Sequence, residues 1–210
     1  MVAMTESAEL VEKGFLTSSC CPAFVSYIKK SFPDLIPLIS HNPSPMAAIA
    51  KYLKETDSPC KVVFIGPCTA KKAEAQLEEV KSYVDCVLTF EELQGMFDAK
   101  DINFAEIETD PADSMDEGTG FGRGFAVGGG VAAAVVEAIK HIDPSREIQI
   151  EYGDGLRECK KMLMMAKAGK RNGYLLEGMG CPGGCVAGAG TIAPVQECCC
   201  GAEYHGKPLP

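Results

Sequence analysis

The chain lacks tryptophan, and only 7% of its 210 residues are aromatic. It also lacks an excess of basic residues, because 20 Lys and Arg stand against 29 Asp and Glu and give a net charge of −9. Phosphate binding needs a basic face, so the charge balance excludes a nucleic-acid partner. No apolar run is long enough to span a membrane, and Met1–Ser7 lacks the regions of a signal peptide. We therefore expect a cytoplasmic globular protein with no membrane partner.

Cysteine is the residue type in excess, with eleven in the chain. Disulfide frameworks are typical of small secreted scaffolds, whereas this chain is long and shows no export signal. A zinc ribbon or knuckle would need Cys-x-x-Cys pairs, and the sequence contains none. Clustered thiols in a reducing compartment therefore favour ligation of a metal or an iron–sulfur cluster.

Three short turns rich in Pro, Gly and Ser carry the informative cysteines, namely Thr17–Pro22, Pro67–Lys72 and Cys181–Cys185. In such turns thiolates can bind iron while free backbone amides point at the sulfides of the cluster. The triplet Cys198, Cys199 and Cys200 is expected to be incidental. The remaining cysteines lie in or beside apolar segments and are expected to be packing residues: Cys60, Cys86 and Cys159.

Strand-like and helix-like segments alternate, which predicts an α/β fold. The apolar run Lys61–Ile65 predicts a buried parallel strand that delivers Cys68 at its carboxyl end, where α/β proteins place ligand sites. The acidic segment 108–120 predicts a solvated loop between lobes. Helices are expected at 4–13, 23–31, 44–54, 70–81, 91–98, 131–139 and 155–168, and strands at 61–65, 84–89, about 151 and 174–176.

In their order and composition, the three turns resemble the signature segments of the iron-only (FeFe) hydrogenase catalytic domain. Those segments are Thr-Ser-Cys-Cys-Pro, Pro-Cys-x-x-Lys-x-x-Glu and Glu-x-Met-x-Cys-x-Gly-Gly-Cys, matched here by Thr17–Pro22, Pro67–Glu74 and Glu177–Cys185. The resemblance implies a two-lobed H-cluster domain with parallel sheets flanked by helices and the active site between the lobes. It predicts a first lobe portion at 1–110, a second at 111–197 and a Cys-rich tail at 198–210.

The resemblance implies an H-cluster, in which a 4Fe-4S cubane shares a cysteine sulfur with a di-iron subcluster carrying CO, CN and azadithiolate. Lys71 resembles the lysine that donates a hydrogen bond to a cyanide, and Met179 and Phe125 match residues packed around the di-iron unit. Glu74 is expected to be a surface carboxylate, with pairing to a cation or positioning of the loop as the alternatives. The residues that match the cubane ligands are Cys21, Cys68, Cys181 and Cys185, the last as the bridging thiolate.

A route for protons is implied in the same way. Cys20 resembles the thiol that passes protons to the bridgehead amine, and a free thiol has a pKa within reach of neutrality. Glu6, Glu9 and Ser40 occupy places of the family's relay, with the basic residue Lys13 one turn later. The alternative for Glu6 and Glu9, which share one helix face, is a solvated carboxylate surface.

The implied activity is reversible hydrogen formation from protons and electrons by a ferredoxin-linked oxidoreductase. Its expected partners are a ferredoxin-like electron donor or acceptor and H-cluster maturation proteins. Two alternatives on the same fold stay open: a non-catalytic iron–sulfur carrier or assembly protein, and a hydrogen-sensing protein. Family members carry a further part of the domain before the segment that begins here at Met1. The alternatives are a fragment, a minimal variant, or a subunit that a second polypeptide completes, and this second polypeptide would be a further partner.

Overall fold

The structure is a computed structural model that describes residues 2–14, 16–57, 59–108 and 120–194. The predicted loop 108–120, apart from its two end residues, and the tail with Cys198, Cys199 and Cys200 lie outside the described residues. The helices are α1 (Val2–Lys13), α2 (Pro22–Ser31), α3 (Pro45–Thr56), α4 (Ala70–Glu74), α5 (Phe90–Asp98), α6 (Gly120–Gly124), α7 (Gly130–Ile142) and α8 (Leu156–Lys167). The strands are β1 (Leu16–Thr17), β2 (Val63–Ile65), β3 (Cys86–Leu88), β4 (Gln149–Asp154) and β5 (Tyr174–Met179).

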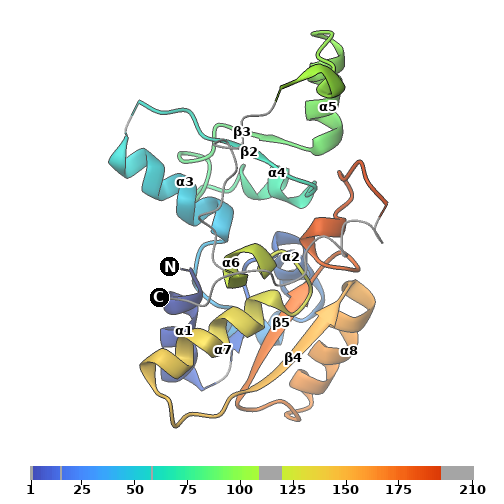
Figure 1. The fold of residues 1–210 in the computed structure, drawn as a ribbon. Helices are drawn as coiled ribbons and strands as arrows, with labels where there is room; N and C mark the ends of the chain where they lie inside the picture. Colours follow the sequence, from blue (N-terminus) through green and yellow to red (C-terminus); the bar gives the residue numbers. More distant parts are fainter. Residues whose placement is uncertain (1, 15, 58, 109–119, 195–210) are drawn as a thin grey trace.

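The larger sheet has the order β1-β5-β4, and all its pairings are parallel. Its central strand β5 is buried along almost its whole length, as expected for a parallel strand covered on both faces. Gly178 in β5 leaves room for the ring of Phe24 from α2, since a Cβ there would lie 2.3 Å from ring carbons. Helices α1, α2, α7 and α8 flank this sheet in the lower part of Figure 1 and supply its core.

The smaller sheet pairs β2 with β3 in parallel and lies with α3, α4 and α5 in the upper part of Figure 1. Ala47 and Ala50 of α3 and Val87 of β3 belong to its separate core. Strand β2 has the predicted direction and leads to Cys68, but the expectation that it is buried is wrong. Val63 and Ile65 are 47% and 43% exposed, because the described residues place no layer over that face of the two-stranded sheet.

The predicted helix 70–81 ends at Glu74, seven residues early. From Ala73 onward most of the backbone hydrogen bonds run from an N–H to the carbonyl three residues earlier, as in the bond from the Leu77 N–H to the Glu74 carbonyl. This tighter winding buries Ala75 and Val80 against the small core while Leu77 stays exposed. A purely α-helical periodicity misses such a change of winding.

The fold class predicted from the sequence is confirmed: parallel sheets flanked by helices form two layered lobes. The sheets combine segments that lie far apart in the chain, because β1 pairs with β5 across more than 150 residues, Leu16 facing Leu175. The division at residue 110 stays a prediction about the chain. None of the described helices has the length and apolarity that a membrane span would need.

Candidate metal centre

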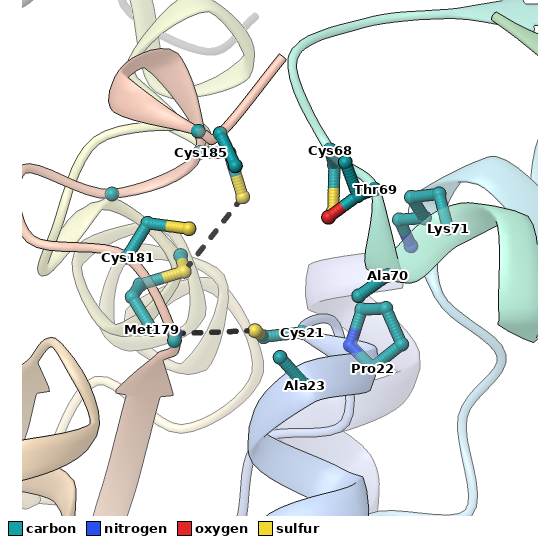
Figure 2. A pocket seen from close by; sticks show the side chains of 14 residues that line it. Cys21, Pro22, Ala23, Cys68, Thr69, Ala70, Lys71, Met179, Cys181 and Cys185 are labelled. Atoms are coloured by element: carbon teal, nitrogen blue, oxygen red, sulfur yellow. Dashed lines mark hydrogen bonds between the residues drawn. The ribbon is translucent and has the colours of Figure 1, made fainter. Parts of the chain in front are cut away.

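One pocket gathers Cys21, Cys68, Cys181 and Cys185, the four thiols that the sequence singles out as metal ligands. Figure 2 shows Cys68 on one side of this pocket and Cys181 and Cys185 on the other, with Cys21 below them. Cys68 comes from the lobe of the small sheet, and the other three come from the lobe of the large sheet. The four thiols, carried by three turns, therefore converge from both lobes.

Cys21 precedes the first turn of α2, which begins with Pro22. Proline at this position has no N–H to lose and fixes the backbone for the helix. The Gly180 N–H donates to the sulfur of Cys21 across 3.3 Å. Cys21 thus stands at the positive end of a ten-residue helix, and its sulfur accepts a backbone N–H.

A backbone hydrogen bond joins the turn with Cys68 to the glycine-rich segment that follows Cys185. The Gly190 N–H donates to the Pro67 carbonyl at 2.9 Å. Gly188 approaches the same carbonyl so closely that a Cβ would lie 2.3 Å from its oxygen. A side chain at Gly188 would therefore push the two thiol turns apart.

The turn Cys181–Cys185 is shaped by its glycines and by an aspartate. Gly184 has φ +83°, and a Cβ there would lie 2.6 Å from the Ala126 carbonyl oxygen. The Gly183 N–H donates to the Asp154 carboxylate at 2.7 Å. Sequence reasoning missed Asp154, although its place at the carboxyl end of a parallel strand was a usable signal.

Burial and neighbouring thiols together raise the pKa of two of the pocket cysteines. Burial, followed by the neighbouring thiols of Cys21 and Cys68, raises the pKa of Cys185 to about 12. Burial, followed by Cys68 and Cys21, raises the pKa of Cys181 as well. Binding of a cationic centre to Cys181 and Cys185 would therefore release their protons.

The donor set fits an iron–sulfur cubane. Each iron of a cubane takes one thiolate, so four cysteines around a cavity suffice without meeting at one point. Among the described residues, no three His, Cys, Asp or Glu side chains are close enough to hold a single metal ion. The pocket thus offers the four sulfur ligands, and an amide on one of them, that such a group requires.

Lys71 lines the pocket beside Cys68, as Figure 2 shows. Its ammonium donates to the Glu74 carboxylate at 2.7 Å and to the Cys20 carbonyl at 3.3 Å. The expectation that Glu74 is a surface carboxylate is wrong: its side chain is 9% exposed and that of Lys71 8%. Pairing with Lys71 makes this burial tolerable, and it fixes the ammonium at the pocket wall.

Met179 and Phe125, both predicted to pack around the cofactor, differ in position. Met179 lines the pocket, with its sulfur 3.9 Å from that of Cys185. Phe125 is half-buried against the large core and is not among the residues that line the pocket. Its packing toward a cofactor stays a prediction.

Cys20 is buried next to Cys21 but does not line the pocket. Burial first, and then the carboxyls of Glu6 and Glu177, raise its pKa well above the ordinary value. Burial thus opposes loss of the proton from Cys20, and its role as a proton carrier stays a prediction. Of the cysteines expected to be packing residues, Cys159 is buried, in agreement with the prediction. Cys86 is exposed, so the prediction that it is a packing residue is wrong.

Glu9 and Ser40, predicted members of the proton relay, meet directly. The Ser40 hydroxyl donates to Glu9 Oε2 at 2.6 Å, and Lys13 Nζ donates to Oε1 at 2.7 Å. Partial burial alone would raise the pKa of Glu9, but bonds from Lys13, Ser40 and the His41 N–H outweigh it and lower the pKa. The side chain is 12% exposed, so the alternative of a fully solvated carboxylate does not describe Glu9.

Glu6 is a buried carboxyl, 1% exposed, and its Oε1 has no hydrogen-bond partner within the described part of the chain. Burial, with the charges of Glu177 and Glu9, raises its pKa to about 8. Glu177 is 0% exposed and accepts N–H groups of Gly129 and Ala132 at the start of α7. Burial raises the pKa of Glu177 to about 7 despite these amide bonds. Sequence reasoning gave Glu177 no role of its own.

We expect the folded protein to lose stability as the pH rises from about 5 to 8, and Glu6→Gln to remove part of this loss. The folded state keeps a proton on Glu6 up to about pH 8, whereas the unfolded chain releases it near 4.5. Since the folded state binds more protons in that window, its free energy of unfolding falls with rising pH, by up to about 1.4 kcal/mol per pH unit for one group.

Urea unfolding of the unloaded protein at pH 5 and pH 7.5, in reductant, measures this effect. Glu6→Gln should match the wild type at pH 5 and exceed it at pH 7.5. Glu78→Gln, a change of an exposed carboxylate that pairs with Lys81, serves as the control and should leave the slope unchanged. An identical pH slope for wild type and Glu6→Gln would contradict the assignment.

Comparison with known proteins gives one family. The family model described as "Iron only hydrogenase large subunit, C-terminal domain" matches residues 1–189. The chain is 32% identical over 212 residues to the periplasmic Fe hydrogenase large subunit of Nitratidesulfovibrio vulgaris, covering 82% of this chain and 50% of that protein. It is 39% identical over 98 residues to the cytosolic Fe-S cluster assembly factor NAR1 of Kluyveromyces lactis, covering 47% of this chain and 21% of that protein.

Solved structures show the same fold. The FeFe-hydrogenase structure of HydA(deltaEFG) aligns with a TM-score of 0.72 at 24% identity and covers 97% of this chain and 71% of its own. A structure of HydA1 from Chlamydomonas reinhardtii aligns with a TM-score of 0.70 at 22% identity, again covering 97% and 71%. The chain spans half or less of the length of the curated hydrogenases it matches.

Proposed function

Because the chain belongs to the family of the iron-only hydrogenase large subunit, C-terminal domain, we propose that it is an FeFe hydrogenase of the H-cluster type. The reaction would combine two protons and two electrons into hydrogen, reversibly. When bound, the H-cluster would supply the electron relay and the metal centre for this chemistry, and the protein would supply positioning, dryness and proton delivery. The convergence of four thiols on one pocket carries the proposal.

In this proposal Cys21, Cys68, Cys181 and Cys185 hold the cubane, and Cys185 also holds the di-iron subcluster. Cys185 suits the second task because its sulfur lies toward Met179, inside the half of the pocket formed by the large lobe. An ammonium has three N–H donors, and Lys71 uses two on protein oxygens. Its third donor is the one available to an anionic ligand such as cyanide.

Proton delivery in the proposal runs from Glu9 through Ser40 and Glu6 to Cys20. The bond between Glu9 and Ser40 and the burial of Glu6 and Cys20 support it. Glu6 keeps its proton near neutral pH because burial raises its pKa to about 8, so it is a carboxylic acid that can both donate and accept. The unpartnered Oε1 of Glu6 is where a bridging water would bind.

A second candidate function is iron–sulfur carriage or assembly without hydrogen chemistry. The similarity to the assembly factor NAR1 favours it, because that match reaches 39% identity over its 98 residues. A carrier needs the four thiols but has no use for a buried proton-donating thiol or a fixed pocket ammonium. The presence of Cys20 and Lys71 therefore favours the hydrogenase.

The proposal includes a ferredoxin-like electron partner, H-cluster maturation proteins and a cytoplasmic location. It also includes a second polypeptide that packs on the apolar face of β2, where Val63 and Ile65 are exposed, because a two-stranded sheet is marginal by itself.

The test is anaerobic loading of the protein with a 4Fe-4S cluster and then with a synthetic di-iron precursor. We expect infrared bands of protein-bound CO and CN, and hydrogen evolution from reduced viologen. A protein that takes up the cubane but shows neither bands nor hydrogen would favour the carrier. A protein that takes up no iron–sulfur cluster would reject both functions.

A further inference from the structure

His41 lies at the surface end of the hydrogen-bonded group around Glu9. Its side chain is 79% exposed, and its Nδ1 lies 3.0 Å from Glu9 Oε1. The same Nδ1 lies 3.0 Å from Lys13 Nζ, with donor and acceptor roles set by the imidazole tautomer. One ring nitrogen therefore faces Glu9 and Lys13 on α1.

Glu9 connects this imidazole to the protein interior. Its Oε1 is turned to His41 and Lys13, whereas its Oε2 accepts the Ser40 hydroxyl at 2.6 Å and the Asn42 amide at 3.1 Å. Ser40 is itself 5% exposed. The two oxygens of one carboxylate thus touch a solvent-facing ring on one side and a buried hydroxyl on the other.

We propose that the His41 imidazole is the proton-exchange group of this chain, transferring protons between solvent and Glu9. The proposal rests on the proposed function, since the protons would be those that the hydrogenase reaction consumes or releases. His41 acts through Glu9 and does not touch the pocket of the four thiols. It extends the predicted relay to the surface by one residue that the sequence pattern did not indicate.

The choice of His41 over Lys13 follows from general acid–base chemistry. Proton transfer is fastest for groups that change charge near the working pH, and imidazole is the side chain that does so between pH 5 and 8. An ammonium in water keeps its proton there and serves Glu9 as a fixed cation instead. Lys13, by pairing with Glu9, keeps the carboxylate ionised and oriented toward Ser40.

The step balances as a transfer of one proton. A buffer acid in solvent protonates Nε2 of the neutral ring, and the N–H bond at Nδ1 then breaks as its proton passes to Glu9 Oε1. The ring is left neutral with its proton on Nε2, and Glu9 becomes a carboxylic acid. The starting tautomer returns when Nε2 loses its proton to water and Nδ1 takes one up, which the exposure of the ring permits.

The first test measures hydrogen evolution by the loaded protein at low buffer concentration, for wild type and His41→Ala. We expect the variant to turn over about ten-fold more slowly, and added imidazole to restore the rate. His141→Ala is the matched control, because His141 is a half-exposed histidine 4.0 Å from Glu137 on α7. It should keep the wild-type rate and show no response to imidazole. An equal rate for His41→Ala, or a loss that imidazole does not restore, would overturn the proposal.

The second test uses nitrogen NMR of the unloaded protein to measure the tautomer of His41 in wild type and in Glu9→Gln. We expect the tautomer ratio to differ between wild type and Glu9→Gln, because the same Nδ1 lies 3.0 Å from Glu9 Oε1 and 3.0 Å from Lys13 Nζ. An unchanged tautomer ratio in Glu9→Gln would show that His41 does not contact Glu9, and the proposal would fail. If the tautomer responds to the substitution but the loaded wild type produces no hydrogen, the proposed hydrogenase function fails. The role of His41 in turnover then fails with it.

Discussion

Cys185→Ala is expected to abolish hydrogen evolution and to prevent attachment of the di-iron subcluster. The residue is one of four thiols around the pocket, and in the proposal it is the thiolate that joins the two parts of the cofactor. Removing it leaves three sulfurs, all committed to the cubane. Infrared spectroscopy after loading should show no protein-bound CO or CN bands, and hydrogen evolution should fall to background.

Cys86→Ala is the matched control for this experiment. Cys86 is an exposed thiol on β3, outside the pocket, so its loss should leave iron content, infrared bands and turnover at the wild-type level. CO and CN bands of wild-type intensity in Cys185→Ala would contradict the assignment of the bridging thiolate. Iron and sulfide analysis of both variants separates loss of the cubane from loss of the di-iron unit.

Cys20→Ala is expected to keep the cofactor and lose turnover by a factor on the order of 10² to 10⁴. The thiol is buried beside Cys21 and does not line the pocket, so its removal should leave the four ligands in place. Its S–H group is the last proton carrier of the proposed route, and a methyl group cannot replace it. Hydrogen evolution measures the loss of turnover, and infrared spectra of the same sample show whether the cofactor is retained.

The control for Cys20→Ala is Cys159→Ala, which removes another buried sulfur from the large core without changing the pocket lining. Both variants leave a similar small cavity, so an effect of packing alone would appear in both. Wild-type turnover of Cys20→Ala would refute the proton role. Loss of the infrared bands in Cys20→Ala would show that Cys20 holds the site together instead.

The four thiols that the sequence singles out line one pocket, and each stands in a short turn with its own local signature, while their role as ligands stays a prediction. The sequence did not predict what holds those turns in place. The bonds from Gly183 to Asp154 and from Gly190 to Pro67 join segments that lie far apart in the chain, so a local pattern can mark one end of such a contact but not its partner. The contact between His41 and Glu9 could not be predicted from local sequence, because it depends on how the segment after Thr17 folds back beside α1.

The failures in burial have a common physical cause. Val63 and Ile65 are apolar and β-branched, which predicts strand but does not reveal how many layers cover the sheet. Glu74 is charged, which predicts exposure unless a partner such as Lys71 is known to be buried beside it. In both cases residue type indicates a preference, and the tertiary environment decides the outcome.

The arrangement of the four cysteines has a mechanical consequence. Cys68 belongs to one lobe and Cys21, Cys181 and Cys185 to the other, so a group bound by all of them would be a covalent cross-link between two bodies. Such a link limits the separation of its attachment points and stabilises the closed arrangement by the free energy of its own binding. Loading should therefore raise the melting temperature and suppress proteolysis between the lobes. Binding of the inorganic group would at the same time fix the position of one lobe relative to the other.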